Sequence, residues 1–139
     1  GLNHALRQSL EDLKSDGLIC KFNEEGIRTR LSSSVEIAVY RLVQEALNNI
    51  RKHAKATKVT LRLQFREDIL LVEIHDNGKG FDLSQTLDSA IAVGHMGLLG
   101  MKQRAEMLGG DIKIKTGAGA GTTLILSLPI QLQQQEEEG

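Results

Sequence analysis

Residues 41–54 read RLVQEALNNIRKHA, and their periodicity predicts a helix with two adjoining faces. The polar face carries Glu45, Asn49 and Lys52 at spacings of four and three residues. A carboxylate, an amide and an ammonium group beside a core edge are unusual for a purely solvated face. They are the groups that a site needs to hold a magnesium ion and the phosphates bound to it. The apolar face collects Val39, Leu42, Val43, Ala46, Leu47, Ile50 and Ala54.

The composition indicates the class of protein and excludes several functions. The chain has 139 residues, of which 40% are hydrophobic and 25% charged, as is usual for one soluble domain. Its net charge of −1 provides no basic field for nucleic acid or an anionic membrane surface. No apolar run reaches about 18 residues, and no signal-peptide pattern opens the sequence. The single cysteine, Cys20, cannot form an internal disulfide, so we expect a small core residue in a reducing, cytoplasmic compartment.

Upstream of the long helix, the sequence predicts a shorter helix and a strand. Leucines at positions 2, 6, 10 and 13 have helical spacing, and Asp16-Gly17 ends that helix. Residues 18–22 are largely apolar and predict a short strand, whereas residues 23–32 are polar and loop-like. Ser33 is followed three residues later by Glu36, a capping box that predicts the start of the long helix.

Downstream of the long helix, two strands are predicted to form an antiparallel hairpin. Apolar and polar residues alternate through residues 59–65, which is the pattern of a half-buried strand. Residues 66–68 make a charged turn, and residues 69–75 predict the second strand. That strand continues directly into the glycine-containing sequence Asp76-Asn77-Gly78-Lys79-Gly80-Phe81.

The last third of the chain predicts a loop, a helix and two more strands. Small and polar residues over 82–93 predict a loop, and residues 101–108 have helical character that Gly109-Gly110 ends. Residues 111–116 and 122–128 predict strands, the second of which stops at Pro129. We expect residues 131–139 to be a disordered, solvent-facing tail.

Three glycine clusters are candidates for a ligand site, and each has a simpler structural explanation. Residues 76–80, DNGKG, fit a turn in which glycine supplies positive φ, or an aspartate that accepts a hydrogen bond from a ligand amine. Residues 94–100 have glycine at every third position and fit a hinge, or an anion site at a helix N-terminus. They are not a Walker loop, because no Gly-Lys-Ser/Thr follows. Residues 117–121 lead into a strand, so a hairpin turn is favoured over a dinucleotide fingerprint.

The combination and order of these motifs resemble the catalytic, ATP-binding domain of bacterial sensor histidine kinases. The subfamily with response regulators of the nitrate-regulator type is most similar, and the superfamily shared with gyrase and MutL proteins is related more broadly. Residues 44–54 resemble the N box, residues 76–81 and 94–101 the first two glycine boxes, and residues 119–122 the last one. The resemblance implies a two-layer α/β sandwich of the Bergerat type, with a mixed sheet of about five strands under three helices.

The resemblance also implies an ATP and Mg²⁺ site with catalytic residues on the long helix. Asn49 would ligate the magnesium ion, and Lys52 and His53 would face the phosphates. Glu45 takes the position that polarises a water in the ATPase relatives, so in a kinase its expected place is beside the metal.

The same resemblance implies an adenine pocket and a phosphate loop. Asp76 would bind the adenine amino group, with Thr122 supporting it through a water, and residues 82–96 would close as a lid. The remaining positions would shape the pocket or bring backbone amides to the phosphates: Gly78, Gly80, Gly97, Leu98, Gly100, Met101 and Gly121.

The implied activity is that of a protein-histidine kinase, which transfers the ATP γ-phosphoryl group to a histidine on a dimerisation domain for relay to a response regulator. His4 lies between Asn3 and Ala5 and lacks the neighbouring acidic residue of the phosphoacceptor motif. We therefore expect residues 1–130 to be a catalytic domain whose substrate histidine lies elsewhere.

The expected full-length protein is a homodimer, either cytoplasmic or with this part in the cytoplasm below a membrane anchor. This segment alone is expected to be a monomer without a nucleic-acid partner. The alternative is another nucleotide-binding module on the same fold, such as an anti-sigma-type serine kinase or an ATP-gated interaction domain. Residues 44–47 and 97–101 favour the histidine kinase.

Overall fold

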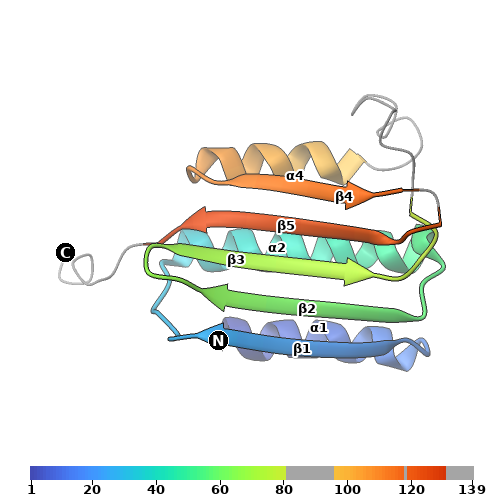
Figure 1. Cartoon of the computed structure of the whole chain (residues 1–139). Helices are drawn as coiled ribbons and strands as arrows, with labels where there is room; N and C mark the ends of the chain where they lie inside the picture. The colour runs from blue at the N-terminus through green and yellow to red at the C-terminus, as the bar shows by residue number, and fades with distance from the viewer. Residues whose placement is uncertain (81–95, 118, 131–139) are drawn as a thin grey trace.

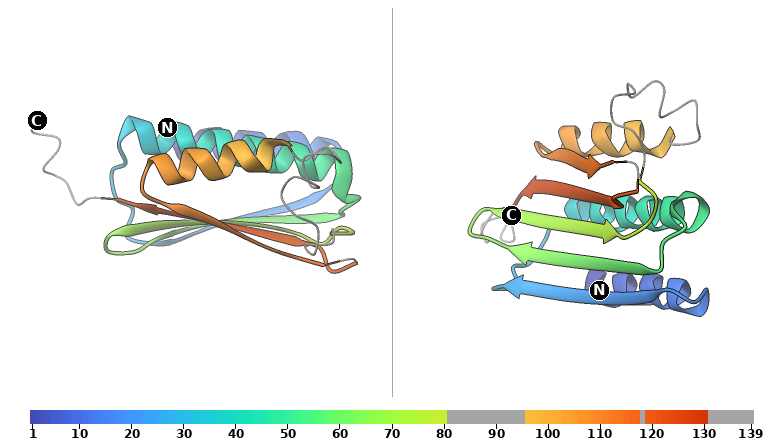
Figure 2. Two further views of the ribbon diagram at one scale, coloured as in Figure 1. Left: turned by 90° about the horizontal axis from the view of Figure 1, so that it is seen from above. Right: turned by 45° about the vertical axis from the view of Figure 1, so that its right-hand side comes forward.

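Two layers make up the part of the chain that the structure, a computed structural model, describes: residues 1–80, 96–117 and 119–130. In these ranges, three α-helices and one π-helical turn lie beside a five-stranded sheet (Figure 1). Seen from above, the helices all lie on the same face of the sheet (Figure 2). Three predicted segments lie outside the described residues: the loop over 82–93, the tail over 131–139, and all of the lid over 82–96 except residue 96.

The observed elements confirm the predicted two-layer α/β sandwich with three helices and a mixed five-stranded sheet. The strand order is β1-β2-β3-β5-β4, in which β1 and β2 are parallel and the other neighbours antiparallel. The elements are α1 (Leu2–Ser15), β1 (Ile19–Gly26), α2 (Ser33–Asn49), η1 (Ile50–Ala54), β2 (Lys58–Phe65), β3 (Ile69–Asp76), α4 (Met96–Met107), β4 (Asp111–Thr116) and β5 (Thr122–Pro129).

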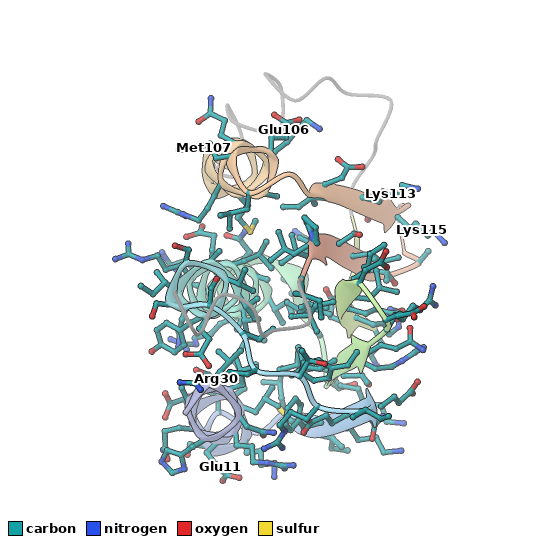
Figure 3. All side chains as sticks on the ribbon, turned by 90° about the vertical axis from the view of Figure 1, so that its left-hand side faces the viewer. Glu11, Arg30, Glu106, Met107, Lys113 and Lys115 are labelled. Atoms are coloured by element: carbon teal, nitrogen blue, oxygen red, sulfur yellow. The ribbon has the colours of Figure 1, made fainter. Side chains whose placement is uncertain are left out.

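The core lies between the layers, where alternate strand residues meet the apolar stripe of α2. Each fully buried aliphatic side chain contributes roughly 1.5–3 kcal/mol, so this seam holds the two layers together. Seen along the strands, side chains fill the space between helices and sheet, while Lys113 and Lys115 of β4 point away from the helices (Figure 3). The buried residues at the centre of the seam, each at most 8% exposed, are Val39, Leu42, Val43, Ala46, Leu47, Ile50, Val59, Leu61, Leu63 and Phe65.

The N-cap of the long helix lies one residue before the predicted cap. Ser32 is the N-cap, and its Oγ accepts a hydrogen bond from the backbone N–H of Val35 at 3.2 Å. The capping box predicted from Ser33 and Glu36 is therefore wrong, because the third helical position is Val35. Three successive serines, at 32–34, offer the same capping chemistry, so the sequence pattern alone does not select among them.

Two other element boundaries differ from the prediction. β1 continues through residues 23–26, which were predicted as loop, because Asn23 to Gly26 pair in parallel with Arg62 to Phe65 of β2. An edge strand needs pairing on one side only, so polar residues can extend it. α4 begins at Met96 instead of residue 101, so Gly97 and Gly100 lie inside the helix and not in a loop before it. None of the described helices is both long and apolar enough to cross a membrane.

Candidate functional site

One end of the two layers gathers the ends of the elements that carry the predicted site residues. β3 ends there, β5 begins there, and α2 passes into η1 at the same end (Figure 1). The first turn of α4 lies at this end as well (Figure 1). Elements that carry all four sequence motifs therefore meet at one end of the fold, although residues 55–118 lie between the first motif and the last.

The motif at residues 44–54 begins in the α-helix α2 and ends in the π-helical turn η1. Glu45 and Asn49 lie one turn apart on α2, and both are half-buried. After Asn49 the chain forms the π-helical turn η1, which contains Lys52 and His53 and is followed by Lys55 in the left-handed conformation (φ 54°, ψ 41°). The predicted continuous α-helix up to Ala54 is thus corrected: its last five residues form a wider turn. Such π-helical turns are frequent at functional sites.

Asp76 is the last residue of β3 and is only 3% exposed. In the sheet it lies opposite Val59 of β2 on one side and Thr122 of β5 on the other. Its Oδ1 accepts a hydrogen bond from the backbone N–H of Gly78 at 2.8 Å. Burial raises the pKa of Asp76, while the Gly78 N–H, the nearby His75 and the Thr122 N–H act in the opposite direction. The fold therefore holds a nearly buried carboxyl group at the end of a central strand.

The glycine turn after Asp76 packs directly against the turn between β4 and β5. Gly80 has φ +65°, and a Cβ there would overlap the carbonyl oxygen of Gly117. Gly121 has φ +76°, and a Cβ there would overlap the carbonyl oxygen of Asp76. Only glycine combines these φ values with this backbone approach. β4 and β5 pair antiparallel across this turn, which confirms the predicted hairpin.

Thr122 lies beside Asp76 and is held by its neighbours in the sheet. Its Oγ1 is 2.9 Å from the Oγ1 of Thr116, and the Thr116 hydroxyl donates to the carbonyl oxygen of Gly121 at 3.0 Å. The structure thus brings Asp76, Gly78, Gly80, Gly121 and Thr122 together, as the resemblance implied.

Asn77 is part of this cluster and was given no role by the sequence interpretation. Its Oδ1 accepts from the backbone N–H groups of Thr57 and Lys58, both at 2.9 Å, and its Nδ2 donates to the Thr57 Oγ1 at 2.9 Å. Asparagine directly after a strand often bonds nearby backbone in this way. That preference could have suggested a structural role, but not the partners, which lie about 20 positions upstream.

The second glycine box is only partly within the described residues. Gly97 and Leu98 lie in the first turn of α4, where helix geometry leaves backbone N–H groups without intrahelical partners. Gly100 is exposed, whereas the Met101 side chain is 2% exposed and belongs to the core. Gly100 and Met101 also line a groove of about 950 Å³ at the meeting point of α1, α2 and α4, to which Glu45 contributes.

Comparison with known families and proteins gives matches to one group. Residues 34–132 match the sequence model of the family described as histidine kinase-, DNA gyrase B- and HSP90-like ATPase. The chain is 44% identical over 100 residues to the signal transduction histidine-protein kinase/phosphatase DegS of Brevibacillus brevis, covering 72% of this chain and 25% of that protein. It is 34% identical over 115 residues to the oxygen sensor histidine kinase NreB of Staphylococcus carnosus, covering 82% of this chain and 32% of that protein.

Solved structures share the fold. The catalytic domain of histidine kinase ThkA superimposes with a TM-score of 0.74 at 13% identity, covering 93% of this chain and 92% of that one. The histidine kinase domain of the blue-light activated kinase EL346 of Erythrobacter litoralis gives a TM-score of 0.69 at 21% identity, covering 93% and 64%. At these identities the likeness concerns the fold. The chain spans a quarter to a third of the length of the two sequence relatives.

Proposed function

The chain belongs to the family of histidine kinase-, DNA gyrase B- and HSP90-like ATPases, and from this we propose that it is the ATP-binding catalytic domain of a sensor histidine kinase. In this proposal it transfers the γ-phosphoryl group of ATP to a histidine on a dimerisation domain, for relay to a response regulator. Sequence relatives that bear the names of sensor histidine kinases support the proposal.

The buried Asp76 beside Thr122 is the observation that carries the proposal. A carboxylate has about four acceptor positions, and the backbone N–H groups of Gly78 and Thr122 use part of that capacity. The remaining capacity suits the amino group of adenine, and hydrogen bonds are electrostatically stronger at such a buried position than in water. Gly78, Gly80 and Gly121 let the backbone turns close around the base, and Thr122 supports the contact through a water.

The phosphates would lie between the end of α2 and the first turn of α4. In this proposal the backbone amides of Gly97 and Leu98, in the first turn of α4, would bind the anion, and Lys52 and His53, which belong to η1, would face it from the other helix. Gly100 and Met101 follow on α4, and the groove that they line includes Glu45 but not Asn49, Lys52 or Asp76, so the proposal does not rest on that groove. Phosphoryl transfer depends mainly on such positioning and charge neutralisation.

The donor set on α2 fits a magnesium ion. Asn49 and Glu45 present an amide and a carboxylate oxygen one turn apart, and Mg²⁺ prefers oxygen ligands shared with substrate phosphates. Asn49 would hold the ion with Glu45 beside it, and the bound ion would offset negative charge on the phosphates.

The domain proposal covers residues 1–130. α1 belongs with the rest because its buried Leu6, Leu10 and Leu13 share one core with Leu128 of β5. The proposed partners are the phosphoacceptor domain, in a homodimer of the full-length protein, and a response regulator. The proposed place of action is the cytoplasm, which follows from the proposed use of ATP.

Titration calorimetry with Mg²⁺ and a non-hydrolysable ATP analogue tests the nucleotide site. We expect the parent chain to bind and Asp76→Asn to bind at least tenfold more weakly, because hydrogen bonds to charged groups contribute about 1.5–3 kcal/mol. No heat from the parent, or equal affinity of the variant, contradicts the site.

Phosphate transfer tests the kinase assignment separately. With labelled ATP, the chain should not label itself but should label the histidine of a supplied sensor-kinase dimerisation domain. Acid-stable label on a serine of that partner would instead favour a serine kinase on the same fold.

A further inference from the structure

Asn77 makes four hydrogen bonds, three of them through its side chain, to a segment that is distant in sequence. Two backbone N–H groups, of Thr57 and Lys58, converge on one side-chain atom, which must therefore be the amide oxygen. The amide nitrogen then donates to the Thr57 hydroxyl, and the Asn77 backbone N–H donates to the Lys58 carbonyl at 3.3 Å. Although Asn77 is exposed, both its amide oxygen and its amide nitrogen make hydrogen bonds to this segment.

The bonded segment connects directly to the helix motif. Thr57 lies five positions after Lys52 and three after the end of η1. Its backbone carbonyl also accepts from the N–H of Ile19, at the start of β1. Thr57 is thus fixed by β1 on one side and by Asn77 on the other.

Asn77 itself follows Asp76 without a spacer. The β2–β3 ladder ends at the pair Val59 and Asp76, so the Asn77 side chain extends the connection beyond the last ladder position. In this arrangement the segment after Lys52 and the residue after Asp76 are joined by one side chain.

We propose that Asn77 is a positioning residue that sets the distance between the phosphate-binding and adenine-binding halves of the nucleotide site. The inference rests on the proposed function and adds a role for a residue that does not itself touch the nucleotide. Asn77 acts through Thr57 and Lys58: without its side chain, residue 77 holds this segment only through its backbone bond to Lys58, and the exit of η1 is held less tightly relative to Asp76. Ligands that span both halves depend on that distance, and ligands that occupy one half do not.

The test compares a spanning ligand with a half-site ligand in Asn77→Ala. We expect the affinity for the non-hydrolysable ATP analogue with Mg²⁺ to fall about tenfold, measured by calorimetry at a temperature where thermal melting shows the variant to be folded. We expect the affinity for adenosine, followed by NMR titration, to change less than about twofold. Gln64→Ala is the matched control, because it removes an exposed cross-strand hydrogen bond to Glu25 at the other end of β2 and should leave both affinities unchanged.

Thr57→Val tests the route of the effect. It removes the hydroxyl that accepts from Asn77 and leaves the two backbone bonds, so we expect the analogue to bind about two- to threefold more weakly. In the double variant the loss should equal that of Asn77→Ala alone, because both changes act on one connection. Should Asn77→Ala fail to fold, Thr57→Val decides with the same two ligands.

Three outcomes overturn the inference. Asn77→Ala could lower the melting temperature yet bind the analogue like the parent, which is the behaviour of a residue with a structural role only. Equal weakening of adenosine and analogue would place the effect on the adenine pocket alone. Additive losses in the double variant would show that Thr57 is not the route. A parent chain that binds no nucleotide would instead contradict the proposed function.

Discussion

The Asp76 side chain is almost completely buried, yet the proposed contact with adenine uses its carboxyl group in the ionised form. Burial raises its pKa above the ordinary value of 3.8, so the folded chain binds a proton there more readily than the unfolded chain. A group of this kind contributes stability that is present at low pH and lost as the pH rises through its folded-state pKa. The adenine contact would therefore be made at a position that weakens the fold near neutral pH.

Asp76→Asn should remove this pH dependence. The variant cannot ionise, so its free energy of unfolding relative to the parent should increase as the pH rises from 3.8 towards neutral, and then level off. Urea denaturation at a series of pH values measures the difference. A difference that stays constant, or that decreases with pH, would contradict the raised pKa.

Gly80 shows how closely two backbone turns approach each other. We expect Gly80→Ala to be destabilised by more than the roughly 1–3 kcal/mol of a left-handed non-glycine residue, because its Cβ also meets the Gly117 carbonyl oxygen. Gly119→Ala is the matched control: Gly119 has φ +78° but nothing within 4 Å of its added Cβ. Equal losses in urea denaturation would mean that the backbone conformation alone, and not the close approach, requires glycine at position 80.

At the scale of elements, α2 was predictable because apolar residues recur at helical spacing along its length, and each of them indicates the same buried face. The π-helical turn after Asn49 was not, since α and π turns have similar local preferences and the choice depends on packing and on the exit at Lys55. The extension of β1 was missed for a related reason. Residues 23–26 form a strand because they pair with β2, and their own sequence is polar and shows no strand alternation.

The helix start gives a direct test of the corrected boundary. Ser32→Ala should lower the free energy of unfolding by about 1 kcal/mol, because it removes the acceptor for the Val35 N–H. Ser33→Ala, one position later and equally exposed, should change it by less than about 0.5 kcal/mol. Chemical denaturation of both variants compares them, and a larger loss at Ser33 would restore the predicted capping box.

At the scale of the whole molecule, the order of motifs along the chain was enough to predict the two-layer sandwich through the family resemblance. The individual contacts within the site were harder to predict from the sequence. Asp76 and Thr122 are adjacent only because β5 inserts between β3 and β4, and Asn77 meets Thr57 only because β2 lies beside β3. The local pattern predicted the β2–β3 hairpin but not the side-chain bonds at its end, and the insertion of β5 is a matter of strand order, which no local pattern encodes.

Ligand binding should stabilise the entire fold, because the proposed site draws on α2, η1, β3, β5 and α4. At 100 times its dissociation constant, the ATP analogue with Mg²⁺ should add about 2.7 kcal/mol to the free energy of unfolding. Thermal melting should show a rise for the parent, a much smaller one when a chelator removes Mg²⁺, and at most about half the parent's rise for Asp76→Asn, which binds at least tenfold more weakly. The same rise with and without the metal would argue against a magnesium-dependent site.

The parallel pairing of β1 with β2 bears on the order in which the chain folds. β2 and β3 are joined by a three-residue turn, whereas residues 27–57 separate β1 from β2. Closing the longer segment costs more chain entropy, and parallel neighbours require a crossover that is already formed. We therefore expect the β2–β3 hairpin and α2 to assemble early and β1 to join late. Because the Thr57 carbonyl receives its bond from Ile19 of β1, the junction after η1 would be completed only when β1 joins the hairpin.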